Sequence, residues 1–204
     1  MSSDATPPAT VVAAAAGPII GIARTFDAAA LPAPTPCADF DVHALLHHLL
    51  QWGPVLESCG RKTPAAAPAE VDLVVGDWRG ALSSQLDGLV AAWGDPAAWE
   101  GMTSMDGVSE LPAALVGGMT MGELVVHGWD LGRALGLAPT WDDDVLELVH
   151  REITSTAEMG RAMGVYGPEV PVPATASTLD RLLGLTGRNP HWAPGGPPQA
   201  GAAG

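Results

Sequence analysis

Breaks rich in proline and glycine divide this chain into segments of helical length, and this spacing constrains the fold more than any other feature. The clearest break is Leu31–Pro36, where three prolines in six residues exclude a helix. Further breaks are expected at Arg61–Glu70, Trp99–Leu111 and Gly164–Pro173. Strand-forming residues are scarce, with 2 Phe, 1 Tyr and four Ile in 204 residues, whereas Ala and Leu abound. The sequence therefore predicts an all-α domain.

The stretches between the breaks repeat apolar residues at helical spacing. We expect helices over Val11–Ala23, kinked at Pro18, and over Phe40–Cys59, Leu73–Trp93, Pro112–Leu135, Asp142–Met163 and Ser177–Leu185. Asp39 is the expected N-cap of the second helix. Four long helices predict a four-helix bundle with a short C-terminal helical appendage. Residues 1–187 would form this single domain, and residues 188–204 a flexible tail of Gly, Pro and Ala.

Charge and cysteine content narrow the possible partners. With 23 Asp plus Glu against 9 Lys plus Arg, the formal charge of −14 argues against nucleic acid and anionic membranes. The most apolar run, Val11–Ala23, is too short to span a bilayer. The first ten residues lack the positive charge of a secretory signal, and Cys37 and Cys59 are too few for a disulfide framework, although one bridge remains possible. We expect a cytoplasmic protein, monomer or homodimer, with a small-molecule substrate.

One stretch of the fourth expected helix carries polar residues that suggest chemistry. Glu123, His127 and Asp130 fall within an arc of about 60° on a helix, and the same arc is apolar above and below. A carboxylate and an imidazole on a buried face need polar partners. Because Glu123 and His127 are four residues apart, they are close enough to bind one cation together. A salt bridge or a polar pair in the core is the alternative interpretation.

A third ligand would have to come from a facing helix. The second helix offers His43, His47 and His48, of which only His48 borders the apolar stripe of that helix. His48, Glu123 and His127 would form a set of two histidines and one carboxylate. Such a set is typical of catalytic zinc sites and also suits nickel or iron.

These residues carry a resemblance to a known family. Thr35-Pro-Cys-Ala-Asp-Phe-Asp-Val42 leads into His48, and Glu123-Leu-Val-Val-His127-Gly-Trp-Asp130-Leu follows later. Together with Tyr166-Gly-Pro-Glu-Val and Leu179-Asp-Arg-Leu-Leu-Gly-Leu-Thr-Gly, this resembles the actinobacterial, mycothiol-dependent maleylpyruvate isomerase-like branch of the DinB superfamily. The resemblance spans roughly Cys37 to Gly187.

The resemblance implies an antiparallel four-helix bundle that holds a divalent metal, usually zinc, through His48, Glu123 and His127. Enzymes of this family use the metal to bind the thiolate of a low-molecular-weight thiol such as mycothiol, for transfer or for cis–trans isomerisation. The isomerase has a separate C-terminal domain that helps to shape its thiol site, whereas only a short helix and tail follow the bundle here. A thiol-independent metal enzyme, in which the metal acts as a Lewis acid or activates water, and a non-catalytic metal-binding protein therefore stay open.

The remaining polar and aromatic residues have less specific interpretations. Asp130 either orients a ligand histidine or pairs with Arg133. Cys37 is expected to act as a small buried hydrophobe, although its place before a helix could activate a thiol. Arg24 and Arg79 are candidates for holding an anionic substrate. We expect solvated imidazoles at His43 and His47, no ligand role at His150 and His191, and core positions for Trp52, Trp78, Trp93 and Trp129, the last of which could border a pocket.

Overall fold

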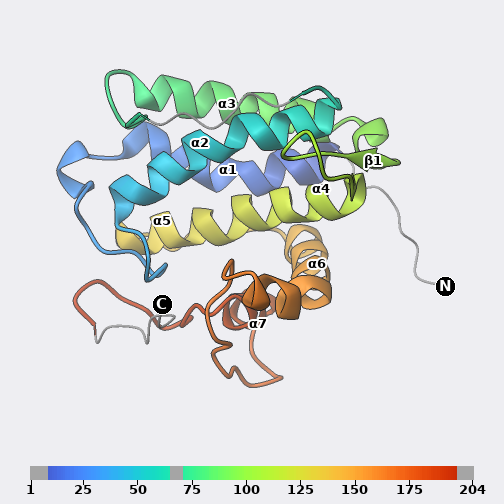
Figure 1. Cartoon of the computed structure of the whole chain (residues 1–204). Coiled ribbons are helices and arrows are strands. Elements are labelled where there is room, and N and C mark those ends of the chain that lie inside the picture. The colour runs from blue at the N-terminus through green and yellow to red at the C-terminus, as the bar shows by residue number, and fades with distance from the viewer. Residues whose placement is uncertain (1–8, 65–70, 197–204) are drawn as a thin grey trace.

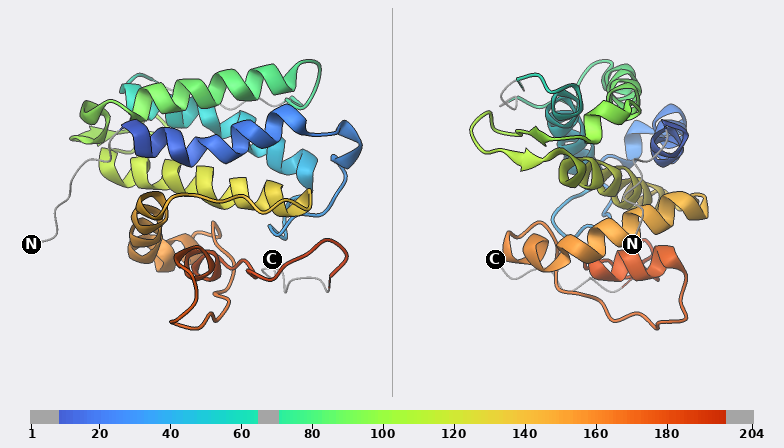
Figure 2. Two further views of the ribbon diagram at one scale, coloured as in Figure 1. Left: turned by 180° about the vertical axis from the view of Figure 1, so that it is seen from behind. Right: turned by 90° about the vertical axis from the view of Figure 1, so that its right-hand side faces the viewer.

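The computed structural model describes residues 9–64 and 71–196, and the chain is mostly helical. Four helical segments lie side by side, and two further helices cover one side of them (Figures 1 and 2). The side-by-side segments are α1 (Ala9–Thr25), α2 (Val42–Arg61), α3 (Trp78–Trp93) and α4 (Ala113–Gly122), the last of which continues through a turn at Glu123–His127 into α5 (Gly128–Ala134). The covering helices are α6 (Asp143–Ala162) and α7 (Thr178–Leu185), and short 3₁₀ turns occur at Ala28–Ala30 and Pro96–Trp99. This agrees with the all-α class expected from the sequence.

A short hairpin stands where the sequence suggested an open loop between α3 and α4. β1 (Met102–Thr103) pairs antiparallel with β2 (Leu111–Pro112), with Met102 opposite Pro112. Asp106 closes the turn between them, because its Oδ1 accepts hydrogen bonds from the backbone N–H groups of Val108 and Ser109. The two strands are too short to produce an alternating apolar pattern that could be recognised in the sequence.

Helices α2 and α3 run in the same direction, which departs from the expected antiparallel arrangement. Gln85 Nε2 donates a hydrogen bond to the carbonyl of Leu49, and Trp93 Nε1 donates to the carbonyl of Leu56, so later residues of one helix meet later residues of the other. Residues 62–77 connect the two helices. At about 3.3 Å per extended residue, a connection of this length exceeds the length of one helix, about 30 Å. It can therefore lead from the C-terminal end of α2 back to the level of its N-terminal end.

Two helix starts differ from the expected ones. Asp41, rather than Asp39, is the N-cap of α2, and its Oδ1 accepts a hydrogen bond of 2.8 Å from the N–H of Ala44. α3 begins at Trp78 rather than Leu73, because the Asp77 side chain caps it by accepting from the N–H of Gly80. In both cases an aspartate closer to the helix satisfies a free backbone donor.

The C-terminal boundary also differs. The expected flexible tail begins at residue 188, but Arg188 and Trp192 are only 6% and 9% exposed. Arg133 Nη2 donates a hydrogen bond of 2.7 Å to the carbonyl of Trp192, which ties this segment to α5. The Gly- and Pro-rich composition suggested disorder, whereas two large side chains anchor the segment. Residues 197–204, and residues 65–70 of the expected break at Arg61–Glu70, lie outside the described residues.

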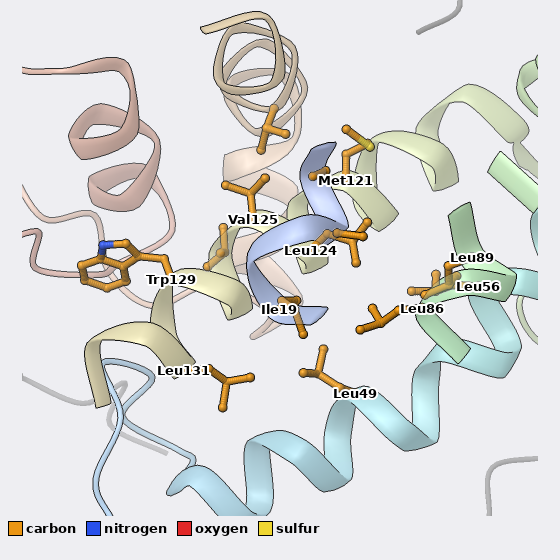
Figure 3. Close-up of a cluster of buried hydrophobic side chains, with 14 of the residues drawn as sticks. Ile19, Leu49, Leu56, Leu86, Leu89, Met121, Leu124, Val125, Trp129 and Leu131 are labelled. Carbon is orange, nitrogen blue, oxygen red and sulfur yellow. The ribbon is translucent and has the colours of Figure 1, made fainter. Parts of the chain in front are cut away.

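The core lies between the side-by-side helices. Leu49, Leu86 and Leu124, from three different segments, converge on the same space (Figure 3). Trp78, Trp93 and Trp129 are buried as expected, whereas Trp52 is only partly buried. In the part of the chain that is described, no helix combines the length and apolar character needed to cross a membrane.

Gly117 of α4 allows close contact with two core tryptophans, and its replacement tests this packing. A Cβ atom there would lie 2.5 Å from Cζ3 of Trp99 and 2.9 Å from Cζ3 of Trp93. Trp99 cannot retreat easily, because its Nε1 donates a 2.7 Å hydrogen bond to the carbonyl of Trp93. We expect Gly117→Ala to lower the free energy of unfolding by about 1–3 kcal/mol, as measured by urea denaturation.

The matched control is Gly21→Ala in α1, where a Cβ atom meets nothing within 4 Å. The gain in helix propensity should make this variant more stable by roughly 0.5–1 kcal/mol. Equal effects of the two substitutions would contradict the packing described for α4.

Candidate metal centre

The structure brings His48, Glu123 and His127 together at the contact between α2 and the α4–α5 segment. One ligand atom from each residue lies within 4.8 Å of the others. Glu123 Oε2 is 3.1 Å from His48 Nε2 and 3.4 Å from His127 Nε2, so both imidazoles face the same carboxylate oxygen. Of the described residues, this is the group of three whose side chains could hold a metal ion. The three candidate ligands chosen from the sequence are therefore neighbours in space.

A wide helical turn presents two of these ligands. Residues Glu123–His127 form a π-helical turn between Gly122 and Gly128, so the helix is not regular at this point. A π turn replaces the usual i→i+4 hydrogen bonds with i→i+5 bonds and often marks a functional site. The spacing in the sequence predicts a regular α-helix here. The wider turn changes the angle between the side chains but keeps Glu123 and His127 on the buried side.

Glu123 is ionised in this setting. Burial by itself would raise its pKa, but the charge of His127 and the hydrogen bond and charge of His48 outweigh burial and lower the pKa to about 2. Its side chain is 29% exposed, that of His48 23% and that of His127 9%. The group thus joins a carboxylate and two imidazoles at a partly open position. Two nitrogen ligands and one oxygen ligand fit zinc, nickel or iron.

The second ring nitrogen of His127 has a partner of its own. His127 Nδ1 is 3.0 Å from Oδ2 of Asp130, a carboxylate that is completely buried. Asp130 also accepts a 3.1 Å hydrogen bond from Nη2 of Arg188, whereas Arg133 bonds elsewhere. Of the two roles considered for Asp130, the structure therefore favours contact with the ligand histidine. Burial would raise the pKa of Asp130, but Arg188 and His127 lower it, so the carboxylate is charged.

Arg188 is the residue at this site that sequence reasoning missed. It lies just after α7, in the segment expected to be a flexible tail. The sequence indicates Arg188 only indirectly. A buried aspartate such as Asp130 needs a cation nearby, but the chain has several arginines, and the sequence does not show which of them lies next to Asp130.

An aromatic ring packs against the two histidines. The ring centroid of Phe40 is 5.2 Å from that of His48 and 6.4 Å from that of His127. Cys37 lies three residues earlier and is partly buried. Burial raises the pKa of its thiol to about 11, although Arg188 acts in the opposite direction. Cys37 is therefore a protonated thiol near the site and not an activated one, as expected from the sequence.

An apolar pocket lies beside Glu123. It lies between α2, α3 and α4 and is small, because the space in it that a water-sized sphere can enter is about 20 Å³. Apolar side chains supply almost all of its surface, and Glu123 is the charged residue that lines it. Five of these apolar side chains are labelled in Figure 3, namely Leu49, Leu56, Leu86, Leu89 and Leu124. Trp52, rather than Trp129, borders this pocket.

The other candidate residues lie away from the three ligands. His43 contacts Asp72 at 3.2 Å, and His47 contacts the carbonyl of Val71 at 3.1 Å, so neither joins the site. Neither His150 nor His191 belongs to the group that could hold a metal, and the side chain of Arg24 is exposed. Arg79 donates to the carbonyl of Phe26 and stacks 4.4 Å above the ring of Trp78, which is a structural role rather than anion binding.

Two curated proteins are similar to this chain, and their names state no activity. No protein-family model and no solved structure matches the chain. Among curated proteins it is similar to "Uncharacterized protein Rv0738" and "Uncharacterized protein MT0763", from the H37Rv and CDC 1551 strains of Mycobacterium tuberculosis. Each is 26% identical over 164 residues, which cover 78% of this chain and 85% of the relative. The function must therefore be argued from the site itself.

The protonated state of Cys37 gives a direct chemical test. At pH 8 a thiol with a pKa of about 11 has far less thiolate than an unfolded cysteine. We expect iodoacetamide to alkylate Cys37 in the native protein on the order of 100-fold more slowly than in guanidinium-unfolded protein, as followed by mass spectrometry. Equal rates in the two states would show instead that Cys37 is a reactive nucleophile.

Proposed function

We propose that this protein binds one divalent metal ion, zinc as first choice, through His48, Glu123 and His127. The observation that carries the proposal is the approach of Nε2 of both histidines to the same oxygen of Glu123, at 3.1 and 3.4 Å. The Asp130 contact adds support, because a carboxylate on Nδ1 leaves Nε2 free to bind a metal. Three protein ligands also leave a coordination position open for a substrate.

We further propose that the chain is a DinB-like four-helix bundle of the maleylpyruvate isomerase-like branch. The side-by-side packing of α1, α2, α3 and α4–α5 supports this assignment, as does the presence of the three ligands on two of these segments. The mycobacterial relatives agree with the actinobacterial origin of that branch, although their names state no family.

The proposed activity is the transfer or isomerisation of a small electrophile by a low-molecular-weight thiol such as mycothiol. A divalent ion at this site would lower the pKa of a bound thiol and so supply a thiolate at neutral pH. The protein has no thiolate of its own here, because burial keeps Cys37 protonated and Cys59 is fully buried. An external thiol is therefore required, and it would meet the electrophile at the partly exposed side of the three ligands.

A thiol-independent enzyme is the second candidate. The same three ligands would allow a metal to activate water or polarise a carbonyl group, and this needs no thiol-binding domain. The set of three ligands favours either enzyme over a metal-binding protein without catalysis, because a structural zinc site is normally closed by a fourth protein ligand, and the group among the described residues has three members.

Metal analysis of variants tests the site. We expect about one metal ion per chain in untagged wild-type protein and a loss of most of it in His48→Ala and His127→Ala, because each variant leaves only two ligands. The measurement is elemental analysis after dialysis. His43→Ala is the matched control, since His43 lies on the same helix but contacts Asp72 instead of the site. Equal metal content in all four proteins would refute the proposed centre.

A thiol assay tests the activity. Zinc-loaded protein incubated with mycothiol and a panel of activated alkenes, epoxides and alkyl halides should consume thiol, and Glu123→Ala should not. Loss of free thiol and the mass of the conjugate are the measurements. If zinc binds but no thiol gives turnover, the thiol mechanism is wrong and the water-activating candidate takes its place.

A further inference from the structure

Arg188 is buried next to the proposed metal centre although it comes from a distant part of the sequence. The residue is 6% exposed and follows α7, which packs on α6 and not among the four side-by-side segments. Its Nη2 donates to Oδ2 of Asp130 at 3.1 Å, and its Nη1 donates to the carbonyl of Thr186 at 3.0 Å. The guanidinium group is thus held by its own segment and directed at one carboxylate oxygen.

That oxygen is shared with a metal-ligand candidate. Oδ2 of Asp130 lies 3.0 Å from Nδ1 of His127 and 3.1 Å from Nη2 of Arg188. Because this oxygen accepts a hydrogen bond from Arg188 and lies at hydrogen-bonding distance from the ring, we assign the proton of His127 to Nδ1 as the second donor. A neutral imidazole that donates from Nδ1 carries its lone pair on Nε2. This is the atom that faces Glu123, and hence the metal position.

The geometry of the Arg188–Asp130 pair is not the geometry that would give the strongest ion pair. A guanidinium group can bind both oxygens of a carboxylate with two parallel hydrogen bonds. Here one bond is made, and among the described residues neither Oδ1 of Asp130 nor Nε of Arg188 has a hydrogen-bond partner. The pair makes one hydrogen bond instead of two, and Oδ2 of Asp130 lies against both Arg188 and His127. A role in orienting His127 explains this arrangement better than a role in stability alone.

We propose that Arg188 is a positioning residue for the metal centre. It fixes the orientation of Oδ2 of Asp130, and Asp130 in turn fixes the tautomer and ring orientation of His127. The segment after α7 is then part of the site, because it supplies the side chain that orients Asp130. This inference rests on the proposed metal centre.

Zinc affinity of Arg188→Met tests the inference. Loss of a group that orients a metal ligand typically weakens metal binding about 10- to 100-fold, and we expect a loss in this range, measured by competition with a chromophoric chelator. Arg133→Met is the matched control. Arg133 also comes from this part of the fold and anchors the same segment through Trp192, but it does not touch Asp130. Its zinc affinity should stay within about threefold of wild type.

A second comparison keeps the test decisive even if Arg188→Met folds poorly. The zinc affinity of Asp130→Asn is compared with that of the double variant Asp130→Asn/Arg188→Met. The double variant has no unpaired cation in the core, because it lacks the guanidinium group as well as the carboxylate. If Arg188 acts through Asp130, the two proteins should bind zinc equally within about threefold, because coupled residues do not add. A further tenfold loss in the double variant would show a route that bypasses Asp130 and would overturn the proposal.

The tautomer of His127 provides a readout that a purely structural role would not change. In zinc-loaded wild type, ¹⁵N NMR of the imidazole should show a protonated Nδ1 and a metal-bound Nε2, and Asp130→Asn should change the Nδ1 signal. Wild-type protein that binds no zinc would refute the metal centre itself. Wild type that binds zinc as tightly as Arg188→Met would refute the role of Arg188 alone.

Discussion

The packing of α2 against the α4–α5 segment is the contact on which the candidate site depends. Polar groups at such a contact cost free energy unless they satisfy one another. His48, Glu123 and His127 do so through a single shared oxygen, at 3.1 and 3.4 Å. The leucines around them, among them Leu49 and Leu124, hold the two segments at this distance. The apolar core therefore fixes the distances between these three polar side chains.

The two covering helices, α6 and α7, also contribute to the geometry of the candidate site. α6 and α7 cover one side of the four segments (Figure 2). The chain that follows α7 returns to the site, where Arg188 contacts Asp130. A buried carboxylate such as Asp130 would be unfavourable alone, and so would a buried guanidinium. Each makes the other tolerable, and Nδ1 of His127 contacts the same oxygen, Oδ2, that accepts from Arg188. The appendage is thus connected to the site by charge as well as by packing.

Local patterns in the sequence were enough for the helices and for the three ligand positions. Apolar spacing placed six helices within a few residues of their bounds, and the position of His48 beside its apolar stripe separated it from His43 and His47. The predictions that were wrong concern features that depend on contacts between distant parts of the sequence. The shared direction of α2 and α3 follows from a connection that carries no pattern. The π turn at Glu123–His127 interrupts a stretch whose spacing predicts a regular helix. The burial of Arg188 depends on how a Gly- and Pro-rich segment folds back, and composition alone suggested the opposite.

Charge around the site limits the substrates that the protein itself can hold. Arg188 is bound to Asp130, Arg79 to the carbonyl of Phe26, and the surface of the pocket beside Glu123 is almost wholly apolar. An anionic substrate would therefore depend on the divalent ion of the proposed centre to offset the repulsion from Glu123, because no arginine of this set is free to bind it. A neutral electrophile with an apolar part meets no such penalty, and it also fits a chain whose formal charge is −14. Within the proposed function, a neutral electrophile thus needs no counter-charge from the protein, whereas the reactive sulfur must come from outside it, because burial keeps Cys37 protonated.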